Sequence, residues 1–328
     1  MFKDQVDEIL QKAIRRRASD ILFLPKEGQY VLKFNIMGVA REVAQLPLAY
    51  GLQIINYLKF KADMALSEHR RPQVGAYLLE DKDNKKVFGR FSSIGDFLGH
   101  ESLVIRLIYQ ETNVNESYFF PEQLQRMQAA CAQKGLILFS GPVGSGKTST
   151  MYNLVRSLEK GQVMCIEDPV EIYEPAFLQV QVNEKAKMSY AELIKASLRH
   201  RPDVFIVGEI RDPETAQIVI TAALSGHLIL STVHAQNAWG VVRRLLDLGV
   251  SPTDLQQTLQ IIVYQRLLPT REGRIKALFE ELGVSEIPWD KLEKVTVRQM
   301  TPEWRKKLEK CFYNKWISEE TLHKYLKG

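Results

Sequence analysis

Apolar residues in the first 110 positions recur with both helical and strand periods. Four of them fall on one helical face of residues 2–18, namely Val6, Ile9, Leu10 and Ile14. A second helix is expected over residues 50–66. Short apolar runs bounded by turn residues predict strands at Ile21–Leu24, Tyr30–Phe34, Val74–Leu79, Val87–Ser92 and Ser102–Tyr109. The pattern predicts a small α+β domain over residues 1–110.

A polar stretch follows at residues 110–117 and predicts a linker or hinge over residues 111–120. Beyond it, apolar runs predict strands near residues 136–140, 163–167, 204–208 and 228–232, with helices between them. This alternation predicts a largely parallel α/β sheet within residues 121–328, with right-handed crossovers. Loops at the carboxyl ends of its strands are expected to build the functional site.

The strand expected near residues 136–140 leads into Gly-Pro-Val-Gly-Ser-Gly-Lys-Thr at residues 141–148. A Gly-x-x-x-x-Gly-Lys-Thr pattern between a strand and a helix, here residues 147–159, is typical of a loop that binds a triphosphate. Backbone amides hold the phosphates, Lys147 faces the β- and γ-phosphates, and Thr148 offers its hydroxyl to Mg²⁺. The nucleotide-binding candidates are Gly141, Pro142, Val143, Gly144, Ser145, Gly146, Lys147, Thr148 and Ser149. The alternative is a glycine-rich turn with a solvated lysine.

Acidic residues follow the next two expected strands. Carboxylates at strand ends beside a triphosphate suit Mg²⁺ or water. The candidate Mg²⁺ ligands are Thr148, Glu167, Asp168 and Glu209. Glu209 is the candidate for polarising the attacking water, and Glu171 is the second candidate. The alternatives are a polar turn at residues 167–171 and a surface ion pair between Glu209 and Arg211.

Two histidines flank the strand expected near residues 228–232. His227 and His234 lie too far apart along a strand to bind one metal ion together. His234, at the carboxyl end, is a candidate sensor of the γ-phosphate, and the alternative is an ordinary hydrogen-bonded loop residue.

Composition excludes several classes of protein. The net charge of +5, from 44 basic and 39 acidic residues, is too small to indicate nucleic-acid binding by itself. The three cysteines, Cys131, Cys165 and Cys311, are widely spaced and predict free thiols instead of a zinc site or disulfides. Without an apolar run of transmembrane length or a signal peptide pattern, the chain is expected in the cytosol.

Four blocks of the chain, in this order and spacing, resemble the ATPases of type II secretion, type IV pili and competence pseudopili. Residues 141–148, 166–171, 206–212 and 226–234 resemble the Walker A, Asp, Walker B and His boxes of that superfamily. The resemblance implies a RecA-like P-loop ATPase domain preceded by a small α+β domain, with ATP and Mg²⁺ as cofactors. It also implies that Glu209 is the catalytic carboxylate.

Two blocks of the first domain, residues 89–92 and 104–107, resemble the family's arginine blocks. Arg90 and Arg106 are therefore candidate arginine fingers that neutralise charge on the γ-phosphoryl group. The alternative for each is an ion pair at a strand edge.

Some blocks depart from the family. Leu22 and Leu24 stand where His and Glu are usual, and Val74 stands where Asp is usual. The chain is expected to lack the extra N-terminal domain, the tetracysteine zinc module and the C-terminal block of retraction motors. What remains most resembles the short competence ATPases of Gram-positive bacteria.

The resemblance implies a cytoplasmic homo-hexamer at the inner face of the membrane that powers pseudopilin assembly through a polytopic inner-membrane platform protein. Alternatives are a pilus retraction ATPase, a non-hydrolysing nucleotide sensor and a nucleic-acid motor. The densest basic and aromatic segment is residues 301–328, with seven Lys or Arg against four Asp or Glu. We expect this tail to pack as helices with a solvated basic face or to dock a membrane partner, and direct DNA binding is not expected.

Overall fold

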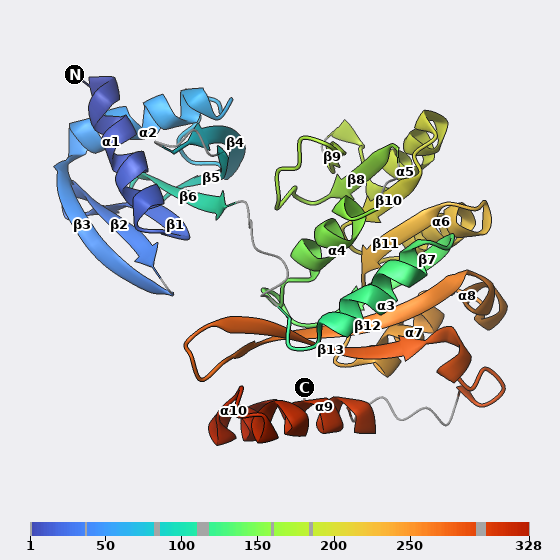
Figure 1. The fold of residues 1–328 in the computed structure, drawn as a ribbon. Coiled ribbons are helices and arrows are strands. Elements are labelled where there is room, and N and C mark those ends of the chain that lie inside the picture. The colour runs from blue at the N-terminus through green and yellow to red at the C-terminus, as the bar shows by residue number, and fades with distance from the viewer. Residues whose placement is uncertain are drawn as a thin grey trace. The chain divides into compact units, whose positions relative to one another are not determined.

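The computed structural model describes residues 2–36, 38–81, 86–109, 118–158, 161–183, 186–292 and 300–327. The chain divides into two compact units, Met1–Glu111 and Thr112–Gly328 (Figure 1). Most of the predicted linker, residues 111–117, lies outside the described residues, so its role as a hinge stays a prediction.

The first unit is an antiparallel sheet with two helices on one face (Figure 1). Its elements are α1 (Phe2–Arg15), β1 (Asp20–Lys26), β2 (Gln29–Ile36), β3 (Val39–Pro47), α2 (Leu48–Lys61), β4 (Gln73–Glu80), β5 (Lys86–Gly95) and β6 (Glu101–Tyr109). The strand order is β3-β2-β1-β6-β5-β4. Apolar residues of α1 and α2 pack on inward residues of the strands, so the predicted α+β character is confirmed.

Three features of this unit differ from the sequence prediction, one of which is α2, which runs from Leu48 to Lys61 instead of over residues 50–66. Helix α1 ends at Arg15 instead of residue 18, because Arg17 takes a left-handed backbone (φ 52°) and the Ser19 amide already bonds the carbonyl of Asn35 on β2. Strand β3 was not predicted. It is an edge strand with mostly exposed residues, so its sequence lacks the alternating apolar pattern of a half-buried strand.

A buried ion pair joins α2 to β6. The ammonium of Lys59 lies 2.7 and 2.9 Å from the carboxylate oxygens of Glu101, and both side chains are almost fully buried. Lys59 also donates to the carbonyl of Glu68 at 2.7 Å, and His69 Nδ1 lies 2.9 Å from Glu101 Oε2. Two charges out of water are tolerated here because each has close hydrogen-bonding partners.

The second unit is a seven-stranded sheet between two layers of helices (Figure 1). Its strands are β7 (Gly135–Ser140), β8 (Val163–Glu167), β9 (Leu178–Gln181), β10 (Val204–Val207), β11 (Leu228–Thr232), β12 (Leu259–Pro269) and β13 (Ile275–Gly283). Their order is β13-β12-β7-β11-β10-β8-β9, and every neighbouring pair is parallel except the β12–β13 hairpin. The predicted α/β class is confirmed.

Helices cover both faces of this sheet. They are α3 (Pro121–Cys131), α4 (Lys147–Arg156), α5 (Tyr190–Ser197), α6 (Pro213–Leu224), α7 (Ala238–Asp247), α8 (Pro252–Thr258), α9 (Pro302–Tyr313) and α10 (Glu319–Tyr325), with short 3₁₀ turns at Leu198–His200 and Val284–Glu286. Residues of α3 and α4 pack on one face, and residues of α5 to α9 pack on the other. A strand that is buried on both faces has an unbroken run of apolar residues in its sequence. The central strands of this sheet could be predicted for this reason.

Three strands of this sheet were not predicted. Strand β9 has four residues and no fully buried side chain. Strands β12 and β13 carry buried polar residues, Gln265 and Glu280, that interrupt their apolar runs. Gln265 donates to the Ser145 carbonyl, and Glu280 accepts from the amides of Ala238 and Thr301, so tertiary partners satisfy both.

Three further observations concern the cysteines, the helix lengths and the basic tail. Cys131, Cys165 and Cys311 are buried free thiols. None of the helices in the described ranges combines the length and the apolar character that a membrane crossing requires. Within the tail, Trp304 is fully buried and its indole donates to the carbonyl of Tyr325 at 2.8 Å.

Removal of the Glu101 charge is expected to destabilise the first unit strongly. Glu101→Gln keeps the shape but leaves the Lys59 ammonium buried without its counter-ion, which should lower the free energy of unfolding by about 3–5 kcal/mol. Hydrogen–deuterium exchange of peptides from residues 2–109 measures this unit separately. The matched control in the same unit is Arg71→Gln, which removes an exposed i,i+3 pair with Glu68 and should cost much less. Equal losses in the two variants would contradict the role assigned to the buried pair.

Candidate nucleotide-binding site

The predicted phosphate-binding loop connects β7 to α4 and lies against β12. Three of its glycines, Gly141, Gly144 and Gly146, have positive φ values of 139°, 76° and 82°. A Cβ atom on Gly141 would lie 2.3 Å from the carbonyl oxygen of Gln265. The side-chain amide of Gln265 donates to the Ser145 carbonyl at 2.7 Å. The loop is therefore fixed by β12 in a conformation that favours glycine at these positions, most strictly at Gly141.

Lys147 begins α4 and lies within this loop. Its Nζ donates to the carbonyl oxygens of Gly141 and Pro142, each at 3.0 Å. Burial lowers the pKa of Lys147, and the nearby carboxylates of Glu171 and Glu209 oppose that shift. A half-buried cation on neutral carbonyls at a helix N-terminus suits an anionic ligand, so the residues present fit a bound phosphate.

Thr148 and Glu171 meet beside Lys147. The Thr148 hydroxyl donates to Glu171 Oε2 at 2.9 Å. A hydroxyl and a carboxylate are oxygen ligands of the kind that Mg²⁺ prefers. In the part of the chain that the structure describes, no three His, Cys, Asp or Glu side chains are arranged to hold a metal ion. Mg²⁺ commonly binds through one or two protein oxygens plus substrate phosphates, so this pair fits the ion.

Glu209 lies in the loop after β10. Its Oε2 is 3.3 Å from Nε2 of His234, and its Oε1 is 3.4 Å from Arg211. The neighbouring backbone is fixed, because the Ile210 amide donates to the carbonyl of Thr232 at 2.8 Å. The structure thus brings together Glu209, His234 and the Arg211 ion pair that was the alternative reading, at the carboxyl ends of β10 and β11.

Glu167, by contrast, lies in the interior. Its side chain is 3% exposed and accepts a 2.7 Å hydrogen bond from the Tyr152 hydroxyl, which accepts from Gln179 at 2.8 Å. Burial raises the pKa of Glu167 to about 7, although the bond from Tyr152 opposes the shift. Burial and the Glu167 charge also raise the pKa of Tyr152. Glu167 therefore connects β8 to α4 and β9.

The predicted metal ligands therefore lie in several different environments, with Glu209 beside His234 as described above. Thr148 lies with Glu171, whereas Glu167 lies with Tyr152. Asp168, directly after β8, is exposed. Sequence reasoning missed Tyr152 and Gln265, because a tyrosine among apolar helix residues and a glutamine in a strand carry no local signal of a role at this site.

Arg90 and Arg106 lie in the first unit, directly opposite each other on β5 and β6. They occupy the face of the sheet that α1 and α2 leave uncovered, because the alternate residues Phe91, Ile105 and Leu107 face the helices. Arg106 is 64% exposed and its Nε lies 3.0 Å from Oδ1 of Asp20. The ion pair considered as the alternative for Arg106 is present, and the finger role of both arginines stays a prediction.

Comparison with known proteins identifies the family to which this chain belongs. The family model described as "Type II/IV secretion system protein" matches residues 1–287. The chain belongs to the type II/IV secretion system protein family. With its phosphate-binding loop and RecA-like sheet, this family member is an ATP-hydrolysing enzyme.

Among curated relatives, the competence protein ComGA of Streptococcus pneumoniae is 43% identical over 273 residues, covering 82% of this chain and 85% of that protein. ComGA of Bacillus subtilis is 36% identical over 266 residues, covering 79% and 74%. The type IV pilus assembly ATPase PilB of Acinetobacter baylyi is 35% identical over 268 residues, covering 80% of this chain and 46% of PilB.

Among solved structures, the pilus retraction motor PilT with bound ADP is similar in fold. It has a TM-score of 0.78 and 24% identity, covering 97% of this chain and 96% of PilT. The similarity supports the two-unit fold of this family member, with an α+β unit before the RecA-like one.

The buried Glu167 should make stability depend on pH. Its pKa is about 7 when folded and about 4.5 when unfolded, so the folded state binds more protons between these values. The free energy of unfolding is therefore expected to fall as pH rises from 5 to 8, by up to about 3 kcal/mol. Glu167→Gln removes this titration.

Thermal and denaturant unfolding at pH 5 and pH 8 would measure the difference. Glu167→Gln should gain stability over the parent chain as pH rises, whereas Glu214→Gln, at an exposed carboxylate, should follow the parent profile. Parallel profiles for all three proteins would show that Glu167 is ionised in the fold.

Proposed function

We propose that this chain is a Mg²⁺-dependent motor ATPase that powers assembly of a competence pseudopilus or a similar type IV pilus-like fibre. The proposal depends mainly on the phosphate-binding loop. Glu171 and Glu209 lie close enough to its Lys147 for both carboxylates to oppose the lowering of the lysine's pKa. The competence proteins and the pilus assembly ATPase among the relatives support the biological role.

Each site residue has a defined task in this proposal. Lys147 exchanges the carbonyls of Gly141 and Pro142 for the β- and γ-phosphates. Thr148 and Glu171 would hold Mg²⁺, and the ion would neutralise phosphate charge. Glu209 orients the attacking water and accepts its proton.

His234 is 3.3 Å from Glu209 and is therefore suited to act through it. An imidazole at this distance from Glu209 Oε2 can fix the orientation of the carboxylate toward the water. If a γ-phosphate attracted the same imidazole, His234 would move away from Glu209 and the contact between the two side chains would be lost. This makes His234 a positioning residue that responds to the nucleotide state.

The proposed assembly and its mechanical cycle are inferred from the chain's membership of this family. The working assembly is a homo-hexamer at the cytoplasmic face of the membrane, and residues 111–120 are the proposed linker or hinge. ATP closes the arrangement, Arg90 and Arg106 then reach the phosphates, and release after hydrolysis moves a polytopic membrane platform protein. The partners are this platform protein and the pseudopilin assembly machinery.

A nucleic-acid motor is not favoured. Base stacking needs a row of exposed aromatic side chains along a basic groove, whereas in the basic tail Trp304 is fully buried, Trp316 stacks on Phe119 and Tyr313 is exposed. Direct DNA binding is therefore not part of the proposed function.

Binding and hydrolysis should separate in two variants of the site. Lys147→Ala is expected to weaken binding of a fluorescent ATP analogue by at least about tenfold, because the main phosphate-facing charge is lost. Glu209→Gln keeps the shape without the base, so it should bind the analogue normally and lose about 100-fold or more in turnover. Turnover of Glu209→Gln at the parent rate would move the base to another carboxylate, with Glu171 the first to test.

The arginines of the first unit should affect turnover more than binding. A finger acts on charge that develops in the transition state, so Arg90→Ala and Arg106→Ala should lower turnover by about 100-fold or more while ATP affinity changes little. Asp20→Asn is the control, because it removes the ion pair of Arg106 and keeps both guanidinium groups. If either arginine variant only lowers the melting temperature and hydrolyses ATP at the parent rate, that arginine is structural.

A further inference from the structure

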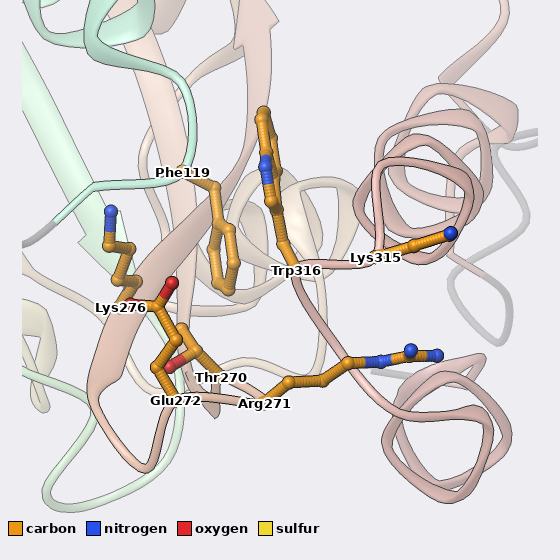
Figure 2. Close-up of a pocket in the computed structure, with 7 residues that line it drawn as sticks. All are labelled: Phe119, Thr270, Arg271, Glu272, Lys276, Lys315 and Trp316. Atoms are coloured by element: carbon orange, nitrogen blue, oxygen red, sulfur yellow. The ribbon is translucent and has the colours of Figure 1, made fainter.

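The second unit contains a cavity of about 240 Å³ that lies outside the nucleotide site (Figure 2). Three segments that are distant in sequence form it. Phe119 comes from the segment before α3, Arg271, Glu272 and Lys276 from the β12–β13 turn and the start of β13, and Lys315 and Trp316 from the link between α9 and α10.

The walls of this cavity are fixed by direct contacts. The rings of Phe119 and Trp316 stack with centroids 6.1 Å apart, at an angle of 24°. The backbone amide of Arg271 donates to the Trp316 carbonyl and its Nε donates to the Ile317 carbonyl, both at 2.9 Å. The hairpin turn and the helix link are thereby held together, so the cavity is formed before any ligand arrives.

The rim of the cavity is positively charged. Arg271, Lys276 and Lys315 face one acidic residue, Glu272, which lies 4.0 Å from Arg274. Within the described ranges, the side chains of Lys276 and Lys315 form no ion pair or hydrogen bond. Figure 2 shows these two lysines on opposite sides of the Phe119–Trp316 pair. An aromatic wall between two cations that lack carboxylate partners suits an apolar group flanked by negative charges.

The volume selects among ligands of this kind. Small-molecule sites usually measure about 300–1,000 Å³, so a cavity of about 240 Å³ accepts one large side chain more readily than a whole nucleotide. Interface anchors are commonly a single buried aromatic or aliphatic side chain, and complementary charges at the rim set its specificity.

We propose that this cavity binds a short acidic peptide segment of a partner protein. One aromatic or aliphatic side chain of the segment packs against Phe119 and Trp316. Carboxylates on either side of that side chain pair with Lys276, Lys315 and Arg271.

The test uses the full chain and a fluorescein-labelled peptide of sequence Glu-Asp-Phe-Asp-Glu, followed by fluorescence anisotropy. Peptides with alanine in place of the phenylalanine, or with lysines in place of the acids, are expected to bind at least about tenfold more weakly. The double variant Lys276→Glu and Lys315→Glu should lose binding of the acidic peptide by a similar factor. Lys306→Glu with Lys324→Glu, which makes the same charge change on α9 and α10 away from the cavity lining, should bind as the parent does.

Lys147→Ala separates this site from the phosphate-binding loop and should leave peptide binding unchanged. Melting temperatures of all variants exclude loss of fold as the cause. Three results would overturn the proposal. The first is equal binding of the acidic and lysine peptides, and the second is unchanged binding in the Lys276 and Lys315 double variant. The third is full competition by inorganic phosphate or a nucleotide at those residues. The last result would assign the cavity to a small anion.

Discussion

The nucleotide site depends on one close backbone approach, between Gly141 of the phosphate-binding loop and Gln265 of β12. A side chain at position 141 would collide with the Gln265 carbonyl, and the Gln265 amide holds the other end of the loop through Ser145. Because β12 is the parallel neighbour of β7, the register of these strands sets where the loop lies. The conformation of the phosphate cradle is thus fixed by a strand more than a hundred residues away in sequence.

Burial gives the three glutamates of the site different chemistry. Glu167 is enclosed by α4 and β9, and its pKa is raised to about 7. Glu171 is exposed and Glu209 is partly exposed, and both carboxylates oppose the lowering of the pKa of Lys147 by burial. A carboxylate that is protonated near neutral pH is a poor Mg²⁺ ligand, whereas accessible ionised carboxylates suit Mg²⁺ and water. This difference favours Glu171 over Glu167 as the partner of Thr148 at the ion.

The parts of this fold that the sequence predicted are those with a local cause. The run Leu136 to Phe139 is apolar throughout because alternate residues meet helices on both sides, and Gly-x-x-x-x-Gly-Lys-Thr is a loop pattern that needs no distant residue. The interior position of Glu167 depends on Tyr152 and Gln179, which approach only in the folded chain. Strand β12 escaped prediction for the same reason, because its polar residue Gln265 is satisfied only by the loop that it holds.

The first unit places two guanidinium groups side by side on one face of its sheet. Arg90 and Arg106 stand directly opposite on neighbouring strands, and like charges in that position destabilise a sheet. Asp20 offsets part of this cost through Arg106, at the edge of the pair. A phosphate shared by two guanidinium groups offsets more, since each forms charge-assisted hydrogen bonds with it. Two guanidinium groups placed side by side in this way therefore suit a ligand with several negatively charged oxygens, such as a phosphate.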